Sequence, residues 1–208
     1  MLSSIHPLGE RSRGNRFPKT ATAFVVGSTV GGASTGVLVG GLGQLAARVA
    51  QWLVETTSAV DQIFSPRLIM VTGVAAYLFA HSFGPNKLPG AGRQVNEDWL
   101  TSYRWWVYGG GFGFQLGCGL AIFITSGLVW LWVVSLFLME SWMWAGVVGA
   151  TFGFCRGLLI LTTRSIRSPS DLVGFHQRLQ RLGVPVGRAE VAVLGLLVVA
   201  LPLSAHIR

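Results

Sequence analysis

Few side chains in this chain could carry chemistry, and most of them lie inside long apolar stretches. Arg156 is the only formally charged residue within the stretches that we predict to cross a membrane. A polar or charged group at that depth is costly unless it faces a partner or water, so each one is a functional candidate. The groups that could line a polar pathway are Arg156, Gln115, Thr35, Thr125 and His81. Two of them have a plainer interpretation, in which Arg156 extends its guanidinium to the headgroups and His81 forms a local hydrogen bond.

Cys118 and Cys155 are the only cysteines, and both lie in apolar stretches. Cysteines in such positions commonly act as small apolar filling groups. The alternative is a pair of thiols that relays reducing equivalents, which requires both sulfur atoms to meet at one water-accessible cavity. Two buried cysteines do not indicate a secreted fold held together by disulfides.

Other kinds of site are disfavoured by spacing. The four histidines are scattered without the spacing of metal ligands, so we expect no metal site. The glycine-rich runs are not followed by Lys-Ser or Lys-Thr, so they do not resemble phosphate-binding loops. No Ser, His and acid combination can be nominated as a catalytic set. We expect no cofactor, and the sequence favours a role other than that of an enzyme without deciding the matter.

Composition indicates that lipid is the solvent for much of the chain. Of 208 residues, 51% are hydrophobic and only 12% are charged, whereas roughly a quarter of residues are charged in soluble domains. The formal charge of +8 comes from Lys and Arg that punctuate the gaps between apolar stretches. This distribution is typical of charges that set membrane topology, so we expect no nucleic-acid partner.

A membrane-crossing helix needs about 20 apolar residues. The predicted spans are 21–46, 68–83, 105–129, 142–163 and 191–205. The segment 130–140 is bounded by tryptophans and is predicted to be a hairpin at the membrane interface. We therefore predict an all-α bundle of five to six membrane segments over residues 21–208, preceded by a basic cytoplasmic segment over residues 1–20.

The positive charges set the predicted orientation, because Lys and Arg concentrate in cytoplasmic loops. With the N-terminus inside, the cations at the inner side are Arg11, Arg13, Arg16, Lys19, Lys87, Arg93, Arg104, Arg164, Arg167, Arg178, Arg181 and Arg188. This orientation leaves Arg48, Arg67 and Arg208 outside. The expected location is a bacterial-type cytoplasmic membrane, with membrane lipid as the first partner.

Glycines recur at four-residue spacing in three of the predicted spans. The three sets are Gly32, Gly36 and Gly40; Gly109, Gly113 and Gly117; and Gly149, Gly153 and Gly157. Each set forms a groove on one helix face where another backbone can approach closely. Tight packing explains the glycines, and helices that break or move along a pathway are the alternative. Runs 27–36 and 110–119 are also alike, which suggests a duplicated helical hairpin.

The loop 164–188 is predicted to form a basic amphipathic helix. Its apolar residues are Leu172, Phe175, Leu179 and Leu182, and Arg178 and Arg181 lie between them. Such a helix binds anionic lipid at the inner leaflet, or it offers a docking surface to a cytoplasmic partner.

The stretches 6–16, 93–99 and 108–117 resemble a group of small actinobacterial membrane proteins. More distantly, the paired glycine-rich spans resemble the membrane thiol-disulfide transporters of cytochrome c maturation, which are built from duplicated helical units. In that family each repeat carries a cysteine beside prolines. Cys118 matches the second of these cysteines, whereas Thr35 occupies the place of the first and the prolines are absent.

Three functions follow as expectations. The leading one is a small permease-like or transporter-like protein that moves a small solute or ion between the glycine-rich hairpins. The alternative is a non-catalytic membrane subunit that scaffolds a larger complex, with a membrane-protein partner or a second copy of the chain. The third is a thiol-disulfide relay through Cys118 and Cys155.

Overall fold

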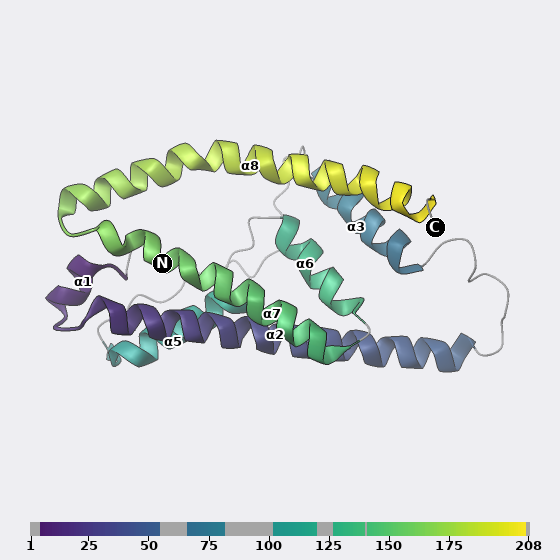
Figure 1. Cartoon of the computed structure of the whole chain (residues 1–208), viewed down its shortest axis with the longest axis horizontal. Coiled ribbons are helices and arrows are strands. Elements are labelled where there is room, and N and C mark those ends of the chain that lie inside the picture. The colour runs from purple at the N-terminus through teal and green to yellow at the C-terminus, as the bar shows by residue number, and fades with distance from the viewer. Residues whose placement is uncertain (1–4, 55–65, 82–101, 120–126, 140, 207–208) are drawn as a thin grey trace.

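A computed structural model describes residues 5–54, 66–81, 102–119, 127–139 and 141–206. Within these ranges every regular element is a helix, which confirms the predicted all-α class. The elements are α1 (Pro7–Ser12), α2 (Phe17–Val54), α3 (Pro66–His81), α5 (Trp105–Cys118), α6 (Gly127–Phe137), α7 (Trp142–Leu158), the 3-10 helix η2 (Leu159–Ser165) and α8 (Pro169–His206). In Figure 1, α2 and α7 run side by side with α5, and α8 starts near α1 and arches back over the bundle.

Helix α2 is the centre of the packing, and glycines let α5 and α7 approach its backbone. A Cβ atom added at Gly117 of α5 would overlap the carbonyl oxygen of Ser28, and one added at Gly32 would overlap that of Gly149 on α7. The four-residue spacing places such glycines on one face. The prediction that the glycines form close-packing grooves is confirmed, because all three predicted sets lie at these contacts.

Polar side chains reinforce the same interfaces. The Ser28 hydroxyl donates a hydrogen bond of 2.6 Å to the carbonyl oxygen of Gly153, which joins α2 to α7. The Thr35 hydroxyl lies 3.2 Å from the carbonyl oxygen of Cys118 and joins α2 to α5. Hydrogen bonds between apolar helices each add about 1 kcal/mol, so they supplement the packing rather than replace it.

Two described helical segments, Phe17–Val49 and Trp142–Ser165, are long and apolar enough to cross a membrane, and Gly127–Phe137 is apolar but shorter. The two long segments correspond to the first and fourth predicted spans. The described residues thus give two candidate spans by length and composition, fewer than the five to six that the sequence predicts.

The third predicted span, 105–129, is not one continuous helix. Helix α5 ends at Cys118, and Gly119 has a φ of 70° with its N–H bonded to the carbonyl oxygen of Leu116. Glycine takes this left-handed conformation without a Cβ penalty, so it ends the helix inside an apolar run. The predicted interfacial hairpin at 130–140 is also wrong within the described residues, because Gly127–Phe137 forms the helix α6.

Helix α8 replaces two predicted elements with one. It is continuous from Pro169 to His206, and it therefore contains most of the predicted loop 164–188 as well as the predicted span 191–205. Pro185 lies inside this helix, where proline removes one backbone hydrogen bond and favours a bend. At the start of α8 the Ser168 hydroxyl, followed by the main-chain N–H groups of Arg167 and Ser168, lowers the pKa of the Asp171 carboxylate by hydrogen bonding.

An apolar cluster joins α3, α6 and α8. Its buried residues are Ala75, Leu78, Leu131 and Leu194. At the edge of this cluster the Glu190 carboxylate accepts a hydrogen bond from the N–H of Gly127, the first residue of α6. An acid at a helix N-terminus satisfies a free amide and interacts favourably with the helix dipole, so Glu190 fixes α6 against α8.

The α2–α7 contact predicts a contrast between two glycines of the same helix. Gly32→Ala should lower the free energy of unfolding by about 1–3 kcal/mol, because the methyl group collides with backbone of α7. No atom lies within 4 Å of a Cβ added at Gly41, so Gly41→Ala should be neutral or slightly stabilising. Thermal unfolding of both variants in mild detergent measures the difference, and equal midpoints would contradict close packing at Gly32.

Candidate functional site

Glu10 is a carboxylate that is fully buried at the junction of α1, α2 and α5. Its Oε1 atom accepts a hydrogen bond of 2.7 Å from the guanidinium of Arg13. Its Oε2 atom accepts hydrogen bonds from the hydroxyls of Thr20, at 2.6 Å, and Tyr108, at 2.7 Å. A charge removed from water is tolerated when it is paired and its lone pairs are satisfied, and both conditions hold here.

The donors around Glu10 are themselves held in place. The side-chain amide of Asn15 donates a hydrogen bond of 3.1 Å to the Tyr108 hydroxyl. The Arg13 guanidinium lies over the Tyr108 ring, 5.5 Å from its centroid, where the ring face attracts a cation. We call Glu10, Arg13, Asn15, Thr20 and Tyr108 the Glu10 cluster.

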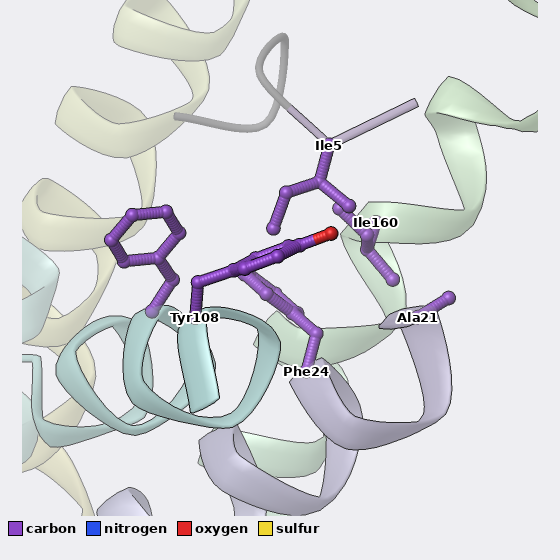
Figure 2. Close-up of a cluster of buried hydrophobic side chains, with 6 residues drawn as sticks. Ile5, Ala21, Phe24, Tyr108 and Ile160 are labelled. Carbon is purple, nitrogen blue, oxygen red and sulfur yellow. The ribbon is translucent and has the colours of Figure 1, made fainter. Parts of the chain in front are cut away.

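Apolar side chains cover the Glu10 cluster. Figure 2 shows the Tyr108 ring lying among Ile5, Phe24 and Ile160, which come from three different segments of the chain. Ile5 and Ile160 are fully buried. Such a cover lowers the local dielectric constant and so strengthens the hydrogen bonds to Glu10.

The N-terminal segment is also tied to the end of η2. The Thr163 hydroxyl donates a hydrogen bond of 2.9 Å to the carbonyl oxygen of Ile5, and the N–H of Leu8 lies 3.3 Å from the carbonyl oxygen of Ile166. His6 caps α1 by accepting a hydrogen bond from the N–H of Gly9 at Nδ1. Burial, followed by the charge of Arg13, lowers the pKa of His6, which favours the neutral ring that this cap requires.

Sequence reasoning overlooked Glu10, which lies in a segment interpreted only as basic and topogenic. A usable signal was present. A His-Pro pair shortly before Glu10 is typical of the start of a short capped helix. Glu10 is also an acid among four cations, a pattern that indicates an ion pair within that helix. Its contact with Tyr108 spans 98 residues and leaves no local mark in the sequence.

The described pathway residues Thr35, Gln115, His81 and Arg156 lie on four different helices, α2, α5, α3 and α7. Thr35 lies in the α2–α5 interface, where its hydroxyl donates to backbone carbonyl oxygens. Gln115 is half-buried on α5. His81 ends α3 and stacks on Tyr77, with the ring centroids 5.7 Å apart. Thr125 lies outside the described residues.

Arg156 is half-buried on α7. Its guanidinium lies 5.6 Å from the ring centroid of Phe152, which in turn stacks on Trp132 of α6. Among the described residues, the Nη1 atom of Arg156 has no hydrogen-bond partner. Arg156 therefore keeps donor capacity that an anion, a headgroup or water can use.

The two thiols have different surroundings. Cys118 is half-buried and its sulfur lies 3.6 Å from the carbonyl oxygen of Gly31, whereas Cys155 is exposed on α7. Both are free, so the described structure contains no disulfide between them. Across the described ranges no group of three His, Cys, Asp or Glu side chains is arranged to hold a metal ion.

Comparison of the chain with protein-family models, with curated proteins and with solved structures gives no match.

Two substitutions test the Glu10 cluster. Tyr108→Phe removes one donor to Glu10 and should lower the free energy of unfolding by about 1–3 kcal/mol. Glu10→Gln leaves Arg13 without its carboxylate and should cost more, about 3–5 kcal/mol. Unfolding midpoints in detergent measure both effects. Tyr77→Phe is the matched control because Tyr77 is exposed on α3, and a loss in the control as large as in Tyr108→Phe would refute the assignment.

Proposed function

We propose that this chain is a multi-pass protein of a bacterial-type cytoplasmic membrane, with five to six membrane segments and its N-terminus inside. Two apolar helical segments of spanning length support the membrane assignment. The orientation is supported by cations of distant segments that gather at one end of the bundle, where α1, the start of α5 and the end of η2 meet (Figure 1). The described cations near this end are Arg11, Arg13, Arg16, Lys19, Arg104, Arg164 and Arg167.

Within that membrane we propose a non-catalytic subunit that holds a partner protein through the N-terminal half of α8. We call residues 169–188 the α8 arm. The observation that carries the proposal is the exposure of apolar side chains along the arm, including Leu182 at 56% and Val186 at 61%. Helix α8 packs on α3 and α6 through residues such as Leu194, which lie beyond the arm.

The packing of the bundle supports a scaffold more than a pathway between the glycine-rich helices. Carbonyl oxygens of α2 contact the glycine faces of α5 and α7 directly. Contacts of this kind leave no room for a solute between those helices, and they give a rigid body over which the arm runs (Figure 1).

Charge on the arm indicates the class of partner. Arg178, Arg181 and Arg188 are exposed and lie among the apolar residues. A complementary surface is an amphipathic helix of a membrane protein that carries acidic residues beside its apolar face.

Site-specific photo-crosslinking tests this proposal. A crosslinking amino acid at Leu182 should capture one partner of defined mass in native membranes, because the arm is the docking surface. The same group at Leu158, an exposed apolar position on α7, is the matched control and should not capture that partner. Identification of an acidic segment in the adduct supports the proposal. Adducts with lipid alone, or only with a second copy of the chain, would overturn it.

A permease-like role is the second candidate, and the free Nη1 donor of Arg156 is the observation that favours it. A guanidinium at membrane depth that keeps a nitrogen without a hydrogen-bond partner suits an anion pathway. Proteoliposomes loaded with chloride should release it, and Arg156→Ala should slow release at least about tenfold, which corresponds to about 1.4 kcal/mol. Arg48→Ala, at an exposed arginine of α2, is the control. Equal rates in the two variants, or no release by the unaltered protein, would refute this candidate.

A further inference from the structure

Helix α1, the start of α2 and the end of η2 line an open cavity of about 420 Å³. The lining residues are Pro7, Leu8, Arg11, Phe17, Pro18, Arg164 and Arg167. The cavity thus combines an apolar wall from the N-terminal segments with three arginines, two of which come from the distant segment that follows α7.

Among the described residues that line the cavity, no acid balances the three arginines, and the charge of Asp171 acts only on Arg167. Glu10, the acid of the adjoining helix α1, is buried and forms an ion pair with Arg13. The acid nearest in sequence to Arg167 is Asp171, whose carboxylate already accepts hydrogen bonds from the main-chain N–H groups of Arg167 and Ser168. Like charges held around one cavity repel each other, so this arrangement favours a bound anion.

Guanidinium groups bind phosphate through paired N–H donors, and clusters of arginine are a recurring phosphate-binding device. Both a free phosphate and a lipid headgroup carry this chemistry. The wall formed by Leu8, Phe17 and the two prolines favours an amphiphile, because a free phosphate gains nothing from apolar contact.

The place of the cavity in the fold also favours a lipid. Phe17 begins one candidate membrane-spanning segment, and Arg164 lies one residue before the end of the other, Trp142–Ser165. The cavity therefore lies where two apolar helices end, at the level where headgroups meet the hydrocarbon in a bilayer.

We infer that this cavity binds the phosphate group of an anionic phospholipid of the inner leaflet, with Arg11, Arg164 and Arg167 as its cationic contacts. The inference rests on the proposed membrane location. The Glu10 cluster acts as a positioning element, since it fixes α1 and thereby holds Arg11 opposite the other two arginines.

Thermal unfolding of the full chain in neutral detergent, with added lipid, tests the inference. Phosphatidylglycerol should raise the unfolding midpoint in a saturable manner, while phosphatidylcholine and inorganic phosphate at equal concentration should not. In Arg164→Gln/Arg167→Gln the apparent affinity for phosphatidylglycerol should fall at least tenfold. The matched control is Arg48→Gln/Arg104→Gln, which removes two exposed arginines that do not line the cavity and should bind phosphatidylglycerol normally.

Each other outcome overturns the inference. An equal shift with inorganic phosphate identifies a soluble anion as the ligand, and an equal loss in the control variant identifies unspecific attraction to basic charge. The midpoint of each variant without lipid shows whether it folds, and Arg11→Gln provides a second route if the double variant does not. Resistance of the protein to extraction from membranes by carbonate tests the membrane location separately, so a failure of lipid binding and a failure of that location can be told apart.

Discussion

The close approach of three backbones along α2 is the constraint on which the rest of the bundle depends. In the membrane location that we propose, lipid tails are as apolar as leucine, so burial of apolar surface contributes little to helix association. What remains is van der Waals contact, which grows as backbones approach, and hydrogen bonds such as that from Ser28 to Gly153. Glycine at the contact positions is therefore a steric requirement, because any larger side chain separates the helices.

The Glu10 cluster obeys a different constraint. A buried ion pair contributes little net stability over an apolar replacement, but removing one member leaves a costly unpaired charge. Glu10 needs donors from α1, α2 and α5 at the same time, and only one arrangement of these helices supplies them. Its main effect is thus to select a single position for the N-terminal segment, and with it the shape of the arginine-lined cavity.

The sequence predicts the features that depend on composition and on local spacing. Hydropathy locates α2 and α7, and the four-residue glycine spacing identifies their contact faces. It does not predict the end of α5 at Cys118, because glycine both packs helices and ends them, and only the backbone conformation at Gly119 distinguishes the two roles. It also misses the continuity of α8 through Pro185 and the burial of Glu10, which depend on tertiary contacts rather than on neighbouring residues.

The long-range bonds of the N-terminal segment impose an order on biogenesis. Glu10 requires Tyr108, 98 residues later, and Ile5 requires Thr163, 158 residues later. During synthesis the segment lacks these partners until α7 and η2 have been made. Packing of α1 on the bundle is therefore a late folding event, which requires that its partner segments have already folded. A chain in which either contact fails to form would leave α1 exposed to proteases.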